Sequence, residues 1–153
     1  MSYSAAAVAN AFIDIAANNG FYLTNLKLQK LVYFAHGWYL AFTDTPLIDD
    51  EVQSWKYGPV IQSLYYELKH YGSDPITKKI PTDKNIVYES EDWNFICSVY
   101  RKYSIFSPAQ LIAMTHEPGS PWEQFGAWKN DFQVIPQEEI KKYFKAMMNN
   151  DRK

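Results

Sequence analysis

The sequence predicts a mainly α-helical fold with a small β element, an α+β arrangement of about six or seven helices around one buried central helix. Three observations carry this prediction. Helix-capping residues precede runs of helical period, one internal run is apolar on all sides, and two short stretches are rich in strand-forming residues. No repeat or linker divides the 153 residues, so a single domain over 1–153 is expected, with 149–153 as a frayed tail.

Capping residues mark the first two helices. Ser4 precedes an apolar face of helical period, and Asn18-Asn19-Gly20 is expected to end this first helix. Thr24 begins the second helix, which is the central helix Thr24–Phe42. Lys27 and Lys30 lie three residues apart near its start, so we expect them to share one face.

The central helix contains two unexpected residues. Ten of the twelve residues from Leu31 to Phe42 are apolar, which predicts a helix buried on most sides, and the exceptions are His36 and Gly37. Glycine weakens a helix by roughly 1 kcal/mol relative to alanine. We therefore interpret His36-Gly37 as the point where another helix crosses closely.

The middle of the chain predicts the β element. Residues 51–57 (EVQSWKY) have the composition of a strand that ends at Gly58-Pro59. Proline favours the first position of a helix, so a helix is expected from Pro59 to Tyr71. Residues 86–88 (Ile-Val-Tyr) predict another strand. Together these stretches predict a two- or three-stranded sheet near 51–57 and 86–88.

The C-terminal part returns to helical patterns. Apolar residues recur at helical spacing from Trp93 to Tyr103. Ser107 and Ser120 each begin a capping box with proline at the first helical position, and a last helix is expected from Gln137 to Met148.

Charge and cysteine content exclude several classes of protein. The formal net charge of −2 argues against sequence-independent nucleic-acid binding, which depends on many basic contacts to phosphate. The single cysteine, Cys97, excludes an internal disulfide and fits a reducing compartment. The N-terminus lacks the pattern of a signal peptide, and no apolar run reaches the ~18 residues of a membrane span. We expect a cytoplasmic protein that does not bind membranes.

Residues that could carry catalysis or bind a metal are few. His36, His70 and His116 lie far apart without ligand spacing, so no metal or cofactor is predicted. Residues 115–122 (THEPGSPW) place an imidazole, a carboxylate and a hydroxyl in one loop, which leaves a small hydrolase using His116 and Glu117 as a hypothesis. Because Ser120 already serves as a helix cap, a protein that is not an enzyme is favoured.

Three stretches in this order resemble the Panacea domain family. They are LTNLKLQKLVYFAHGWYL (Leu23–Leu40), WKYGPVIQSLYYEL (Trp55–Leu68) and THEPGSPW (Thr115–Trp122). The resemblance extends from about Ser4 to Met147. The family includes GepA-type phage-associated proteins and SocA-type antitoxins.

The resemblance implies the antitoxin of a type II toxin–antitoxin system, which neutralises a toxin encoded in the adjacent gene by binding it directly. Two alternatives stay open, namely an adaptor that delivers the toxin to a protease and a phage-encoded factor that acts on host defence. Tyrosine, tryptophan and a few cations are typical of protein interfaces. The candidate partner-binding residues are Lys27, Lys30, Tyr57, Gly58, Pro59, Tyr65, Tyr66 and Trp122. A structural role for Tyr57-Gly58-Pro59 is the competing interpretation.

Overall fold

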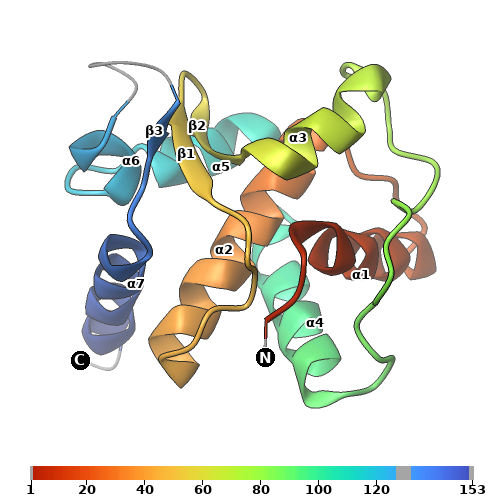
Figure 1. Cartoon of the computed structure of the whole chain (residues 1–153), viewed down its shortest axis with the longest axis horizontal. Helices are drawn as coiled ribbons and strands as arrows, with labels where there is room; N and C mark the ends of the chain where they lie inside the picture. The colour runs from red at the N-terminus through yellow and green to blue at the C-terminus, as the bar shows by residue number, and fades with distance from the viewer. Residues whose placement is uncertain (1, 127–131, 152–153) are drawn as a thin grey trace.

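The computed structural model describes residues 2–126 and 132–151. It confirms a mainly helical fold with a small three-stranded sheet (Figure 1). The elements in chain order are α1 (Ala5–Asn18), α2 (Asn25–Thr43), β1 (Val52–Trp55), β2 (Gly58–Ile61), α3 (Gln62–Leu68), the 3-10 turn η1 (Lys69–Tyr71), α4 (Glu91–Tyr103), α5 (Pro108–Thr115), α6 (Pro121–Gln124), β3 (Gln133–Val134) and α7 (Gln137–Asp151).

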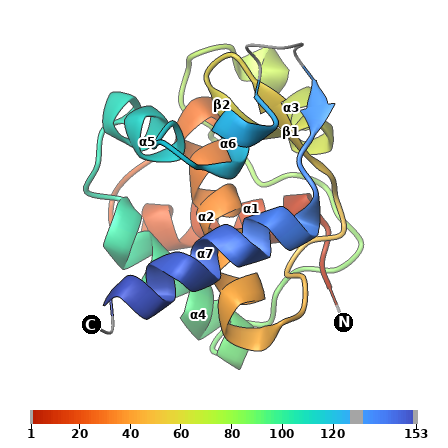
Figure 2. The ribbon, with the colours of Figure 1, turned by 90° about the vertical axis from the view of Figure 1, so that its left-hand side faces the viewer.

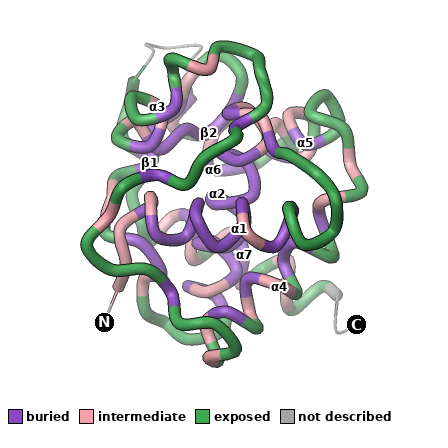
Figure 3. Tube along the Cα trace, turned by 90° about the vertical axis from the view of Figure 1, so that its right-hand side faces the viewer, coloured by how far each residue is buried: buried purple, intermediate pink, exposed green. Residues whose placement is uncertain are grey.

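The central helix α2 runs through the middle of the molecule, as the sequence predicts. Thr24 caps it by accepting a hydrogen bond from the Lys27 amide at 3.3 Å, and Ser4 caps α1 in the same way through the Ala7 amide. Helix α7 packs on one side of α2, and α1 and α4 pack on the other (Figures 1 and 2). The burial pattern in Figure 3 follows from this arrangement, because α2 is buried along nearly its whole length.

The predicted helix crossing is confirmed at Gly37. The ring of Phe144 from α7 lies so close to the Gly37 Cα that a Cβ atom there would come within 2.2 Å of Phe144 Cε2. His36 is 1% exposed, and its Nδ1 accepts a hydrogen bond from the Ile48 amide at 3.4 Å. Burial lowers the pKa of His36 to about 4, although the nearby Asp50 carboxylate acts in the opposite direction. The imidazole is therefore a neutral core group.

The strand order of the sheet is β2-β1-β3, with both pairs antiparallel. Strand β1 confirms the strand predicted at 51–57. A two-residue turn at Lys56-Tyr57 connects β1 to β2, and Trp55 pairs with Gly58. The prediction of a helix from Pro59 was wrong. Pro59 lies in β2 opposite Ser54, and the helix begins only at Gln62.

The predicted strand at residues 86–88 was also wrong, and the third strand is β3. Residues 84–87 are irregular, and Val87 and Tyr88 are largely exposed while Ile86 is buried. Side-chain contacts take the place of strand pairing in this region. The Asn10 side-chain amide donates to the Ile80 carbonyl at 2.8 Å and accepts from the Ile80 amide at 2.7 Å.

The C-terminal helices begin where the capping residues predict. Ser107 and Gln110 form a reciprocal capping box at α5. At α6, the Ser120 hydroxyl accepts from the Glu123 amide, but the Glu123 carboxylate binds the Gly119 amide instead of completing the box. Helix α7 runs to Asp151, further than the predicted Met148. Of the predicted frayed tail, residues 149–151 belong to this helix, and 152–153 lie outside the described residues.

Candidate functional site

Two polar side chains of α2 hold strand β2 against the central helix. Gln29 Oε1 accepts a hydrogen bond from the Ile61 amide at 2.9 Å, and its Nε2 lies 3.4 Å from the Ile61 carbonyl. Lys30 Nζ donates to the Pro59 carbonyl at 3.3 Å. These bonds satisfy backbone groups of β2 that β1 does not pair, so an extended segment is stable beside the helix. The Gln-Lys pair therefore joins the first quoted stretch to the second.

Lys30 is an unusual core residue. Its side chain is fully buried, and burial lowers the pKa of its amine to about 7. No carboxylate in the part of the chain that the structure describes forms an ion pair with Nζ. Placing an unpaired ammonium inside a protein is costly, which is why burial favours the neutral amine.

Gly58 lies where all three sequence stretches meet. Its φ of +119° is a conformation that side chains with a Cβ rarely adopt. A Cβ at this position would also lie 2.7 Å from Lys30 Nζ and 2.8 Å from Thr115 Oγ1. Gly58 is therefore required both by its backbone conformation and by the close approach of α2 and α5.

The segment between α5 and α6 closes over the β1–β2 hairpin. The rings of His116 and Trp122 stack with centroids 3.7 Å apart and an interplanar angle of 2°. Trp122 Nε1 donates to the Trp55 carbonyl at 2.5 Å, and the Ser54 hydroxyl donates to the Trp122 carbonyl at 3.2 Å. The third quoted stretch thus binds the backbone of β1, and its aromatic pair has a structural role.

The His116 imidazole lies in a half-buried position near Lys30 and the Tyr57 backbone. Burial is the main factor that lowers its pKa, and the nearby Lys30 lowers it further, while a hydrogen bond to the Tyr57 backbone acts in the opposite direction. Its Nε2 is buried and has no hydrogen-bond partner among the described residues. Glu117 is exposed, and no bond between its carboxylate and His116 occurs within this part of the structure. The imidazole is held by the Tyr57 backbone and by stacking on Trp122, and neither contact pairs it with a carboxylate.

An apolar groove lies beside the hairpin, and we call it the hairpin groove. Its volume is about 420 Å³. The lining residues are Asn25, Leu26, Gln29, Trp55, Lys56, Tyr57, Val60, Tyr65, Gly72 and Phe132. Trp55 forms edge contacts with both Tyr65 and Phe132, at ring-centroid distances of 4.9 and 4.8 Å. The groove is therefore built from aromatic rings that hold one another in place.

Exposed tyrosines and lysines surround the hairpin groove. Tyr57 is 58% exposed and Tyr66 is 54% exposed. Lys56 Nζ lies 5.5 Å from the centre of the Tyr57 ring, and Lys69 Nζ lies 5.0 Å from that of Tyr66. Neither lysine forms an ion pair with a carboxylate among residues 2–126 and 132–151. Exposed aromatic rings are enriched on surfaces that bind other proteins, and unpaired ammonium groups favour a partner with acidic side chains.

The structure places the predicted partner-binding residues in three different surroundings. Tyr57 and Tyr65 line the hairpin groove, and the ring of Tyr66 lies 5.9 Å from that of Tyr65. Lys27 is half-buried, and its Nζ donates to the Ser104 carbonyl at 2.6 Å. The other four predicted residues are wholly or partly buried where the hairpin meets α2 and α6, and we call this place the hairpin junction. They are Lys30, Gly58, Pro59 and Trp122.

Lys27 and Lys30, which the sequence predicts on one face of α2, make separate contacts. Lys27 contacts the end of α4 while Lys30 is buried beneath β2, so the two side chains do not form one exposed face. The sequence interpretation also missed Leu26, Trp55 and Phe132 as groove residues. Trp55 could have been recognised from the sequence, because it directly precedes the hairpin turn. No local pattern links Phe132 to Tyr57, which lies 75 positions earlier.

Other candidate chemistry is scattered. Cys97 is partly buried on α4, and burial raises the pKa of its thiol. No cluster of three or more potential metal ligands occurs in the described ranges. Among the same residues, no helix has the length and apolar character of a membrane span.

The fold and the three converging stretches define a Panacea-type domain. The family model for the SocA-like antitoxin Panacea domain matches residues 28–123, and the chain belongs to this family. Antitoxin SocA of Caulobacter vibrioides is 34% identical over 131 residues, which cover 80% of this chain and 70% of that protein. No solved structure matches the chain.

Proposed function

We propose that this protein is the antitoxin of a type II toxin–antitoxin pair and that it neutralises its toxin by direct binding, without catalysis. Membership in the SocA-like family is the observation that carries this proposal. The similarity to a curated antitoxin along most of both chains adds support. The partner is proposed to be the product of the adjacent gene, and cytoplasm is the proposed location.

The hairpin groove and its rim are the proposed contact surface. The groove combines a rigid aromatic lining with exposed Tyr57 and Tyr66 and with the unpaired charges of Lys56 and Lys69. Aromatic rings supply large contact area at low entropic cost, and they dominate the energetic centre of many interfaces. The hairpin junction, with its buried Lys30, contributes to binding only indirectly, because it fixes the position of the hairpin that carries Tyr57.

Co-expression with the adjacent gene tests the proposed function. The wild-type protein is expected to restore growth and to co-purify with the neighbouring gene product. The double variant Tyr57→Ala/Tyr66→Ala is expected to weaken the complex at least tenfold while keeping the thermal midpoint. Tyr88→Ala is the matched control, because Tyr88 is 66% exposed and lies outside the groove. A toxic neighbour that is neither bound nor neutralised contradicts the proposal.

A protease-deficient host separates direct neutralisation from delivery to a protease. Direct binding predicts growth rescue at an unchanged toxin level in that host. If rescue disappears and the toxin accumulates when the protease is absent, the protein acts as an adaptor instead.

A further inference from the structure

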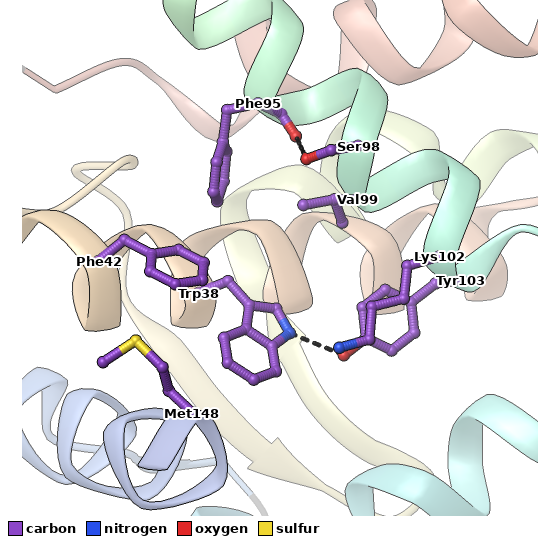
Figure 4. A pocket seen from close by; sticks show the side chains of 8 residues that line it. All are labelled: Trp38, Phe42, Phe95, Ser98, Val99, Lys102, Tyr103 and Met148. Carbon is purple, nitrogen blue, oxygen red and sulfur yellow. Dashed lines mark hydrogen bonds between the residues drawn. The ribbon is translucent and has the colours of Figure 1, made fainter. Parts of the chain in front are cut away.

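A second apolar groove lies at the opposite end of the central helix, between α2, α4 and α7. We call it the distal groove, and its volume is about 340 Å³ (Figure 4). Its lining residues are Trp38, Phe42, Phe95, Ser98, Val99, Lys102, Tyr103 and Met148. Trp38 and Phe42 come from α2, with Phe95 of α4 and Met148 of α7 on either side of them (Figure 4).

The aromatic wall of the distal groove is held in a fixed arrangement. Trp38 Nε1 donates to the Tyr103 hydroxyl at 2.7 Å. The Trp38 and Phe42 rings stack with centroids 5.8 Å apart, and Phe42 meets Phe95 edge-on at 6.3 Å. Because the indole is anchored, the wall does not need to reorganise when it receives another apolar group, which lowers the entropic cost of binding.

The distal groove also contains an unpaired positive charge. Lys102 Nζ lies 4.4 Å from the centre of the Trp38 ring, and no acidic side chain among the described residues forms an ion pair with it. The nearby Ser98 hydroxyl already donates to the Phe95 carbonyl at 2.6 Å. The occupant that complements this groove therefore has an apolar group for the aromatic wall and a carboxylate for Lys102.

The openness of the groove favours a polypeptide over an enclosed small molecule. Phe42 is 54% exposed, and Ser98 and Lys102 are also exposed. Small-molecule sites bury most of the surface of their ligand, whereas a partner chain needs only to insert an anchor side chain into an open groove. An aromatic or aliphatic anchor beside an acidic residue matches both the shape and the charge.

The two grooves are far enough apart to act independently. Leu26 lines the hairpin groove and Phe42 lines the distal groove, and sixteen residues of helix separate them by roughly 24 Å. The crossing of α7 at Gly37 lies between them. One partner that reached both grooves would therefore span roughly 24 Å.

We propose that the distal groove binds a segment of the toxin in which an apolar side chain lies next to an aspartate or glutamate that pairs with Lys102. The identity of the partner as a toxin rests on the proposed function above. The kind of group that the groove binds does not rest on the proposed function, because it follows from the aromatic wall and the unpaired ammonium of Lys102.

A pair of dipeptides tests this chemistry without the toxin. Acetyl-Phe-Asp-amide and acetyl-Phe-Asn-amide have nearly the same shape and differ in the carboxylate. In titrations followed by NMR, the aspartate peptide is expected to shift the Trp38 indole N–H resonance and to bind at least fivefold more tightly than the asparagine peptide. Lys102→Met is expected to remove this preference. Equal binding of the two peptides, or no shift at Trp38, overturns the proposal.

The complex with the adjacent gene product tests the biological partner. Phe42→Asp and Lys102→Glu are each expected to weaken the complex at least tenfold, in variants that remain folded by circular dichroism. The matched controls are Val87→Asp, at a position 70% exposed, and Lys78→Glu, an exposed lysine outside both grooves. Full affinity in both groove variants overturns the distal contact, even if the wild-type complex forms. If the aspartate dipeptide binds but no wild-type complex forms, the proposed function fails and the toxin is excluded as the occupant.

Discussion

The ring of Phe144 lies directly against the backbone of Gly37, within 2.2 Å of where a Cβ would stand. This contact joins the last helix of the chain to the central one, and it leaves no space for any side chain at position 37. The adjacent His36 is equally buried but is held by one long hydrogen bond from the Ile48 amide, at 3.4 Å. The two neighbouring residues are therefore constrained to very different degrees.

We expect Gly37→Leu to destabilise the protein more than His36→Leu. Overpacking typically costs about 1–3 kcal/mol, and displacement of the Phe144 ring places Gly37→Leu at or above the upper end of that range. His36→Leu leaves the Ile48 amide without its partner, which costs about 1–3 kcal/mol before the gain from an apolar side chain in the core. Urea unfolding of both variants measures the difference. A smaller loss for Gly37→Leu would mean that the imidazole is the more constrained group.

The buried imidazole predicts how stability responds to acid. The pKa of His36 is about 4 in the folded protein and 6.5 in its ordinary state, so the unfolded chain binds more protons between these two values. The free energy of unfolding should therefore fall as the pH drops from 6.5 to 4, by up to about 1.4 kcal/mol per pH unit from this group. His36→Leu should reduce the slope in this window. Parallel curves for wild type and His36→Leu would show that the imidazole is not a buried neutral group.

Lys30 predicts a separate effect at alkaline pH. Burial lowers the pKa of its amine from 10.5 to about 7, so the unfolded chain binds one more proton between pH 7 and 10.5. The stability contributed by Lys30 should rise with pH through this window, by up to about 1.4 kcal/mol per unit. The difference between wild type and Lys30→Met isolates this contribution from that of the tyrosines.

Urea unfolding at pH 7, 8 and 9 should give a wild-type curve that rises relative to Lys30→Met. A constant difference between wild type and Lys30→Met would show that the amine stays charged when buried.

The helices were predictable because their signals are local. Ser4, Thr24 and Ser107 stand directly before the helices that they cap, and the apolar run after Lys30 is long enough to predict burial on all sides. The predicted close crossing at Gly37 was also local, since only a close neighbour explains a glycine in such a helix. What the sequence did not reveal was the neighbour itself, Phe144.

Strand β2 of the hairpin was not predictable because its stability depends on distant residues. Pro59 after a glycine is typical of a helix start, but the bonds from Gln29 and Lys30 to the backbone of β2 stabilise an extended segment instead. Lys30 appeared to be a surface cation for the same reason. A lysine near the start of a helix carries no local sign that its ammonium lies beneath a strand some 30 positions later.

The packing at Gly58 gives a test of the junction between the three sequence stretches. We expect Gly58→Ala to lower stability by about 1–3 kcal/mol or more, because the backbone has a φ of +119° and the new Cβ would meet Lys30 Nζ and Thr115 Oγ1. Gly20→Ala is the matched control, since Gly20 also has a positive φ, +81°, but has no atom within 4 Å of the added Cβ. Urea unfolding should show the larger loss for Gly58→Ala. Equal losses would mean that backbone strain alone, and not the close approach of α2 and α5, requires glycine at position 58.

His116 gives the test that separates binding from catalysis. Its ring stacks on Trp122 and its Nε2 has no hydrogen-bond partner among the described residues, so we expect His116→Ala to reduce stability by roughly 0.5–1.5 kcal/mol through loss of the aromatic pair. Growth rescue in the co-expression assay should persist, because the proposed function needs the side chain only to support the hairpin. His116→Phe preserves a ring without an ionisable nitrogen and should recover part of the lost stability. Loss of rescue in both variants, in proteins that remain folded by circular dichroism, would point to a catalytic role for the imidazole and against a purely binding function.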